Sequence, residues 1–217
     1  MNGISLAECL ASADDTKEMV IMEGALEAVP SLLERYFAGA SGEIPPLFLA
    51  ADENTWRAAG AELERVLRAA NLAISGTHIF PAADLHGDYA LAEKLAALMK
   101  ERRGNGSLVP LAIGSGTIND LVKCASAECG LPYCCVPTAA SVDGYTAHGA
   151  ALLKDGFKQT VPCAAPRLVA ADTRVLAKAP AFLASSGYGD LAGKLIAGAD
   201  WIIADKLYAI DPSVPGL

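Results

Sequence analysis

Residues 111–147 constrain the fold of this chain more than any other stretch. An apolar run, 108–113, reads as a buried strand, stops at Gly114-Ser115-Gly116-Thr117, and is followed by a helical pattern with one apolar face. Glycines let a backbone approach an anion, and the first turn of a helix offers free N–H groups, so this order predicts a phosphate-binding turn. An ordinary strand-to-helix turn gives the same pattern, because GSGT lacks the full GxGxxG spacing and the lysine of a P-loop.

A second loop of small residues strengthens the binding interpretation. The apolar run Tyr133–Val136 ends at Pro137-Thr138-Ala139-Ala140-Ser141, and Asp143-Gly144 come shortly after it. Two consecutive strands would therefore end in small side chains at one rim of a sheet. Open α/β sheets bind their ligands at that rim.

The rest of the chain alternates short apolar runs with helical patterns, which predicts a parallel α/β sheet. The further strands are expected at 19–25 (with a glycine turn), 46–51, 77–80 and 167–171, and the further helices at 26–38, 54–70 and 89–102. Asp155-Gly156 predicts a short hairpin within 150–161. Alanine-rich helices are expected at 175–185 and 190–207. We therefore expect a Rossmann-like nucleotide-binding α/β domain over 1–173, followed by the beginning of an all-helical domain over 174–217.

Composition excludes some classes of function. A formal net charge of -8 argues against nonspecific nucleic-acid binding, which needs basic patches. No apolar run approaches the roughly 20 residues that span a bilayer, and no secretory signal is visible, so we expect a soluble, cytoplasmic protein with no membrane partner. The six cysteines form no CxxC pair, which favours reduced, buried thiols over a disulfide or zinc framework.

Three segments carry a family resemblance: GSGTINDLVK, PTAASVDGYTA and GYGDLAGKLIAGADW, in this order and spacing. They resemble the sn-glycerol-1-phosphate dehydrogenases, particularly the bacterial branch, within the group that holds glycerol dehydrogenases, iron-containing alcohol dehydrogenases and dehydroquinate synthases. From about Val20 onward the chain follows this pattern. The resemblance implies a homo-oligomeric oxidoreductase that uses NAD or NADP and one divalent metal to interconvert dihydroxyacetone phosphate and sn-glycerol 1-phosphate, a phosphorylated polyol of phospholipid metabolism. A glycerol or other polyol dehydrogenase, or a nucleotide-binding module without catalysis, is an alternative.

The resemblance also implies which residues bind the dinucleotide. The pyrophosphate turn would comprise Gly114, Gly116, Thr117, Ile118, Asn119 and Asp120, and the second cofactor segment Thr138, Ala139, Ala140 and Ser141. Asp52 ends the second strand and could accept from a ribose hydroxyl, but it could equally cap the following helix together with Asn54. Ala147 stands where the family often has a serine that contacts the cofactor.

Two aspartates are the candidate reacting-site residues. Asp190 follows Gly187-Tyr188-Gly189 at an expected helix start, where it could be a simple N-cap. The resemblance instead makes Asp190 a catalytic residue that binds the metal (zinc, nickel or iron) and touches the substrate. Asp143 could form a turn with Gly144, whereas the resemblance implies that it binds the polyol hydroxyls.

The other ionisable residues add little to this expected site. The family takes two histidine metal ligands from beyond Asp190, but His78, His86 and His148 all precede it. His78 and His86 are expected to be structural, and His148 could line the site.

Because the two histidine ligands are missing, the chain is expected to be a fragment that is inactive alone, or else a naturally short relative without the reaction. Its phosphate-binding groups are expected outside these residues. Asp120 and Lys123 are expected to form a surface pair worth a few tenths of a kcal/mol, with no catalytic role for Lys123.

Overall fold

A six-stranded parallel sheet forms the centre of the computed structural model, which describes residues 5–206. Its strands lie in the order β1-β8-β5-β4-β2-β3. The strands of this sheet are β1 (Glu18–Met22), β2 (Leu47–Asp52), β3 (Ile74–Phe80), β4 (Val109–Gly114), β5 (Cys134–Pro137) and β8 (Leu168–Asp172). The predicted parallel α/β architecture is confirmed.

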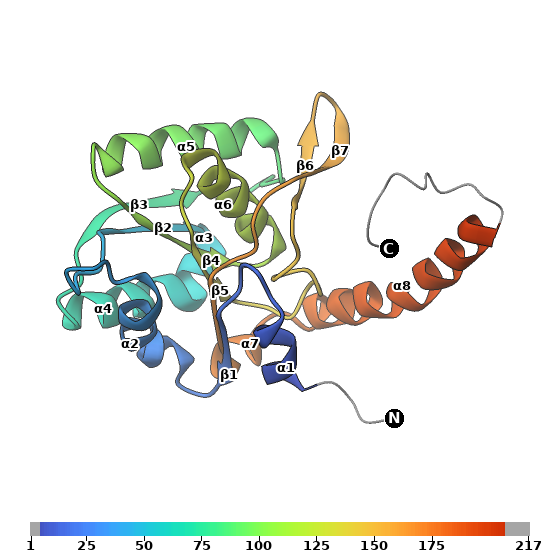
Figure 1. Cartoon of the computed structure of the whole chain (residues 1–217), viewed down its shortest axis with the longest axis horizontal. Coiled ribbons are helices and arrows are strands. Elements are labelled where there is room, and N and C mark those ends of the chain that lie inside the picture. The colour runs from blue at the N-terminus through green and yellow to red at the C-terminus, as the bar shows by residue number, and fades with distance from the viewer. Residues whose placement is uncertain (1–4, 207–217) are drawn as a thin grey trace.

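Helices cover both faces of the sheet. They are α1 (Leu6–Ala11), α2 (Ala25–Phe37), α3 (Glu53–Thr55), the π-helical turn η1 (Trp56–Gly60), α4 (Ala61–Ala69), α5 (Tyr89–Arg103), α6 (Gly116–Cys129), α7 (Thr173–Leu176) and α8 (Ala181–Lys206). The apolar sides of α2 and α4 pack on one face of the sheet. Those of α5 and α6 pack on the other face (Figure 1).

The pattern of burial explains why the strand predictions succeeded. The interior strands β4, β5 and β8 are buried along their whole length, as the unbroken apolar runs in the sequence require. The edge strands β1 and β3 are only partly buried and include polar residues. Five of the six cysteines are buried, and the exception is Cys9.

Strands β2 and β4 lie side by side at the point where the chain changes direction across the sheet. The connection after β2, made by α3, η1 and α4, crosses one face, whereas α6 follows β4 on the opposite face. A crevice outside the carboxyl ends of the strands forms at such a switch point. Asp52 ends β2 and Gly114 ends β4, so both border this crevice.

The predicted hairpin is also present. Strands β6 (Ala150–Lys154) and β7 (Phe157–Val161) pair antiparallel, separate from the main sheet. Asp155 and Gly156 between them both have positive φ, 53° and 79°, which is the geometry of a type I′ turn.

The helical prediction around Asp190 was wrong in one respect. Helix α8 runs without a break from Ala181 to Lys206, so Gly187, Gly189 and Asp190 lie inside a helix and Asp190 does not start one. Leu207, the last residue of the predicted helix, is outside the described residues. Helix α8 has no buried residue and extends away from the α/β body in Figure 1.

Two smaller features were not predicted. Helix α1 precedes the first strand, and the expected helix over 54–70 contains the π-helical turn η1, where the ring of Trp56 covers Gly60 and leaves no room for a Cβ. Between residues 5 and 206, no helix has the length and apolar character that crossing a membrane requires.

Candidate functional site

The glycine turn has the predicted structure. Strand β4 ends at Gly114, and α6 begins two residues later at Gly116 with Ser115 as its N-cap. The Ser115 side chain accepts no hydrogen bond from the first turn of α6. The first N–H groups of this helix are therefore available to a ligand in the crevice. A Cβ at position 114 would come within 2.6 Å of the Ile118 Cβ, which explains the glycine there. This helix end can bind an anion such as a phosphate.

The loop after β5 lies directly beside this turn. The Thr138 N–H donates to the carbonyl oxygen of Gly114 at 3.1 Å, and the Tyr145 hydroxyl donates to the Ala139 carbonyl. Thr138, Ala139 and Ser141 are buried. The two small-residue loops therefore meet at one rim, as the sequence predicted.

Two cavities flank the N-terminus of α6. The first, about 800 Å³, is lined by Asp52, Ser115, Thr138, Ala139 and residues at the start of α8. The second, about 730 Å³, is lined by Gly116, Thr117, Asp120, Asp143 and Asp190, together with residues of the β6–β7 hairpin. An extended ligand with a central phosphate group could occupy both cavities across the helix end.

Asp52 caps a helix in the structure. Its Oδ1 accepts from the backbone N–H groups of Asn54 and Thr55, at 2.7 and 3.0 Å. These bonds match the capping alternative. Since Asp52 also lines the first cavity, contact with a ribose remains a prediction.

Not every residue of the predicted pyrophosphate turn presents its side chain to the crevice. Ile118 lies on the side of α6 that faces the sheet and is buried in the core. Asn119 is buried too, donating to the Tyr145 carbonyl at 3.3 Å and accepting from the Tyr133 hydroxyl at 3.0 Å. The Ile118 side chain therefore belongs to the core, whereas Asn119 lines the second cavity with its side-chain amide held by these two bonds.

Asp143 and Asp190 come together although 47 residues separate them. The backbone N–H of Asp143 donates to Oδ2 of Asp190 at 2.9 Å, and Lys194 Nζ lies 3.3 Å from Oδ2 of Asp143. The N–H of Asp143 holds the pKa of the Asp190 carboxyl below its ordinary value, so this group is ionised at neutral pH. The N-cap alternative for Asp190 is wrong, because the carboxylate binds the loop after β5 instead of its own helix.

Gly187 makes this meeting possible. A Cβ on residue 187 would collide with the carbonyl oxygen of Ala140 and lie 2.9 Å from its carbonyl carbon. Helix α8 therefore crosses the 138–143 loop at a distance that only glycine allows. Gly187 thus lies inside α8 and permits the close approach of the loop. The sequence pattern had instead indicated that the glycines precede the start of a helix.

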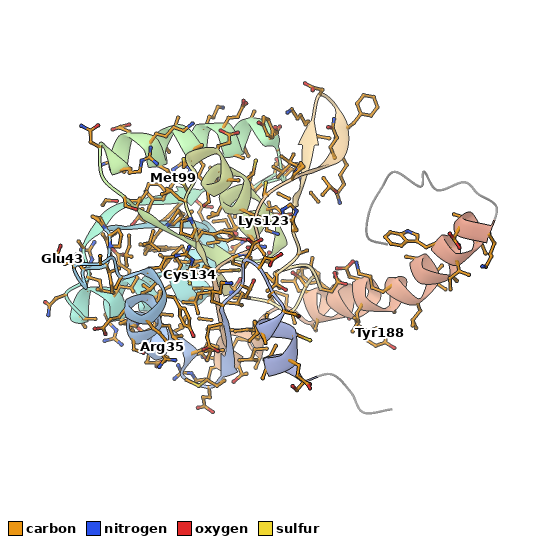
Figure 2. The ribbon with its side chains drawn as sticks, in the orientation of Figure 1. Arg35, Glu43, Met99, Lys123, Cys134 and Tyr188 are labelled. Atoms are coloured by element: carbon orange, nitrogen blue, oxygen red, sulfur yellow. The ribbon has the colours of Figure 1, made fainter. Side chains whose placement is uncertain are left out.

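Lys123 is not on the surface, contrary to the prediction. Its side chain is 1% exposed, and Nζ donates to the carbonyl oxygens of Ala147 and Gly149 at 2.9 and 3.0 Å. Nζ also lies 3.7 Å from the Asp120 carboxylate, whose pKa burial raises. Figure 2 shows Lys123 in the interior, where it ties α6 to the segment leading into the hairpin.

The histidines do not complete a metal site. His86 and His148 line the second cavity, whereas His78 packs edge-on against Phe80, where burial lowers its pKa. Within residues 5–206, no three His, Cys, Asp or Glu side chains lie close enough together to hold a metal ion. The described residues therefore offer Asp190 as a single candidate ligand and do not by themselves fit a divalent cation.

Three polar residues of the second cavity were missed at the sequence level. They are Lys158 and Thr160 on β7 and Lys194 on α8. Because alternate residues of a strand share a face, the expected hairpin already placed Lys158 and Thr160 side by side. This spacing was the sequence signal that could have identified them as site residues.

A family model described as iron-containing alcohol dehydrogenase matches residues 20–180, well over half of the 217 residues. The chain belongs to the iron-containing alcohol dehydrogenase family. The predicted family resemblance is thereby confirmed; the match contains the segments GSGTINDLVK and PTAASVDGYTA, whereas GYGDLAGKLIAGADW lies beyond residue 180.

Two bacterial proteins similar to this chain have the same name. The chain is 38% identical over 156 residues to a protein of Bacillus velezensis named glycerol-1-phosphate dehydrogenase [NAD(P)+], covering 72% of this chain and 39% of that relative. A protein of the same name from Bacillus subtilis is 35% identical, with 74% and 40% covered. The chain thus spans about two fifths of the length of these relatives.

Solved structures of other proteins share the fold of this chain. Glycerol dehydrogenase from Schizosaccharomyces pombe matches with a TM-score of 0.63 at 20% identity, covering 82% of this chain and 44% of that chain. A putative alcohol dehydrogenase from Ralstonia eutropha matches with a TM-score of 0.62 at 22% identity, covering 80% and 45%. At these identities the likeness concerns the fold alone.

Proposed function

We propose that this chain is the nucleotide-binding part of an NAD(P)-dependent dehydrogenase that interconverts dihydroxyacetone phosphate and sn-glycerol 1-phosphate. The observation that carries the proposal is the free end of α6 between two cavities, one of which ends at Asp143 and Asp190. The names of the relatives supply the reaction. The whole protein would act in the cytoplasm as a homo-oligomer.

The two cavities suit a dinucleotide. The N–H groups of Gly116 and Thr117 would bind the pyrophosphate, and the cavity beside Asp52 would take the adenosine. Thr138 and Ala139 line the cavity beside Asp52, and the small, buried residues of their loop, including Ser141, would leave room for the cofactor between this cavity and the nicotinamide side. When bound, the reduced nicotinamide supplies the hydride.

Asp143 and Asp190 would hold the substrate in the second cavity. An ionised carboxylate accepts hydrogen bonds from hydroxyl groups, which favours a polyol over a plain alcohol. The bond from the Asp143 N–H fixes Asp190 relative to the loop that faces the cofactor side, so the two groups orient the substrate as a unit.

A divalent metal is the second cofactor that the family implies. Asp190 would be one ligand, and we propose that the others come from residues outside the 217 described by this sequence, with zinc, nickel or iron as the ion. We also propose a domain division near Thr173. The exposed apolar side chains of α8 support a further helical layer, since a helix of this kind needs a partner surface.

An assay on the natural full-length protein tests the proposal. The purified protein should oxidise NADH or NADPH in the presence of dihydroxyacetone phosphate and form sn-glycerol 1-phosphate. Asp190→Asn should lower kcat/KM at least about 100-fold, because it removes a charge that orients the substrate. Asp200→Asn, an exposed position on the same helix, is the matched control and should leave kcat/KM unchanged.

The alternatives give different results in the same assay. A polyol dehydrogenase would use free glycerol more efficiently than its phosphate. A non-catalytic module would bind the dinucleotide without turnover, and either result would replace the proposed reaction.

A further inference from the structure

One face of the β6–β7 hairpin forms a wall of the second cavity. In the hairpin register, Ala151 lies opposite Thr160 and Leu153 lies opposite Lys158. Alternate residues of a strand share a face, so these four side chains point the same way, and all four line the cavity. Ala150 and Leu152 on the opposite face are buried in the core over α5 and α6, which fixes the orientation of the hairpin.

Two backbone N–H groups of β6 hold the hairpin against the body of the protein, and a third bond closes its base. The N–H of Gly149 donates to the Cys163 carbonyl at 2.7 Å and joins the two ends of the hairpin, whereas the N–H of Leu153 donates to the Gly87 carbonyl at 2.6 Å. The N–H of Ala151 donates to Asp120 at 3.3 Å. The strand pair that bears Lys158 is therefore a positioned element, even though its tip is exposed.

The cavity is lined by charges of both signs, and Lys194 is paired with Asp143. The positive charge of Lys158 acts to lower the pKa of the Asp120 and Asp190 carboxyls. Lys158 makes no ion pair within 4.0 Å of a carboxylate in the described part of the chain. The carboxylates suit the hydroxyl end of a ligand, whereas an ammonium group beside a threonine hydroxyl suits an anion.

From this arrangement we propose that the hairpin face binds the phosphate group of the substrate, and that Lys158 is the residue that selects a phosphorylated polyol over a free one. This inference rests on the proposed function and names the part of the site that determines its specificity. Gly116 and Thr117 at the start of α6 line the same cavity and, in the proposed function, bind the phosphates of the dinucleotide, so the helix end and the hairpin would each take one anion. The sequence had indicated that the phosphate-binding groups lie outside these residues.

The test compares two substrates on the natural full-length protein. For Lys158→Met, kcat/KM for dihydroxyacetone phosphate should fall about 30-fold, the usual scale of a hydrogen bond to a charged group. The kcat/KM for unphosphorylated dihydroxyacetone should change less than about twofold, and Lys158→Arg should restore most of the discrimination. Lys154→Met is the matched control, because Lys154 lies on the other face with its Nζ 4.0 Å from the centre of the Tyr89 ring.

Each outcome can be assigned. If the wild-type protein reduces dihydroxyacetone phosphate and Lys158→Met keeps the same preference between the two substrates, the hairpin proposal is wrong while the proposed function stands. A rise in the KM for NADH without a change for the phosphorylated substrate also overturns it, since Lys158 would then serve the cofactor. A wild-type protein that reduces neither substrate overturns the function and the hairpin proposal together. An unchanged thermal midpoint in Lys158→Met ensures that the comparison concerns binding and not folding.

Discussion

Gly187 is the residue on which the meeting of α8 with the loop after β5 depends. We predict that Gly187→Ala separates Asp190 from Asp143, because the added Cβ would collide with the Ala140 carbonyl. Dinucleotide-dependent activity of the full-length protein should fall at least about 10-fold, in line with a misplacement of reacting groups. Gly189→Ala is the control, since nothing lies within 4 Å of a Cβ there. That variant should keep activity and gain up to about 1 kcal/mol of helix stability, and equal losses in the two variants would contradict the contact.

Asp172 couples stability to pH at the end of β8. Its buried carboxylate accepts from the Arg174 guanidinium and from the Leu26 N–H, and the Arg174 bond, foremost among these, lowers its pKa from 3.8 to about 2. Because the unfolded chain takes up the proton first as the pH falls, this stabilisation is complete above about pH 4 and is lost towards pH 2.

The predicted loss across that range is about 2 kcal/mol in the free energy of unfolding. Urea unfolding at several pH values would measure it. Asp172→Asn should be less stable at neutral pH and should lack this part of the acid dependence. Asp155→Asn, in the exposed hairpin turn, should follow the wild type, and a parallel acid dependence in Asp172→Asn would exclude the coupling.

Sequence reasoning at this scale found Asp143 and Asp190 but not what surrounds them. Both carry a family pattern, whereas their contact joins residues 47 positions apart and is formed by the path of a helix. Lys123 was misplaced for a related reason. A lysine three residues after an aspartate on a helix is typical of a surface ion pair. The carbonyl groups of Ala147 and Gly149, which accept hydrogen bonds from the buried Lys123 ammonium group, are brought there by the fold and are not evident from the sequence.

At the scale of elements, Lys123 joins α6 to the entrance of the β6–β7 hairpin. We predict that Lys123→Met lowers the free energy of unfolding by about 3 kcal/mol, because it leaves two carbonyl groups and the Asp120 carboxylate without a buried cation. Chemical denaturation of the 217-residue chain measures this directly. Lys94→Met, on the exposed side of α5, should change stability by less than about 0.5 kcal/mol. Equal effects at the two positions would mean that the buried contacts contribute little.

The elements themselves were largely predictable. Buried strands appear as continuous apolar runs, and the Asp155-Gly156 turn has a distinctive residue pair, so both were found. The break expected in α8 was wrong because glycine has two uses, ending a helix or allowing close packing, and the sequence does not distinguish them. The π-helical turn η1 depends on the packing of Trp56 over Gly60, which has no local signature.

At the scale of the whole molecule, α8 exposes a large apolar surface. Leu195 is 80% exposed, Ile196 68% and Tyr188 77%, and Figure 2 shows Tyr188 pointing away from the α/β body. We predict that the 217-residue chain self-associates at micromolar concentration through this helix. Leu195→Glu should lower the sedimentation-average mass, whereas Leu6→Glu on α1 should not. A monomeric wild-type chain would contradict the prediction.

Among the described strands of the sheet, β1 is made before the others but has a single neighbour, β8, which is made after the others. The contact from Thr16 to Pro166 beside these strands spans 150 residues. At the usual speed of synthesis, β1 waits roughly 7–30 s for its partner. During translation the order of assembly is thus inverted with respect to the order of the sequence: the middle of the sheet can form early, and the first strand joins it near the end.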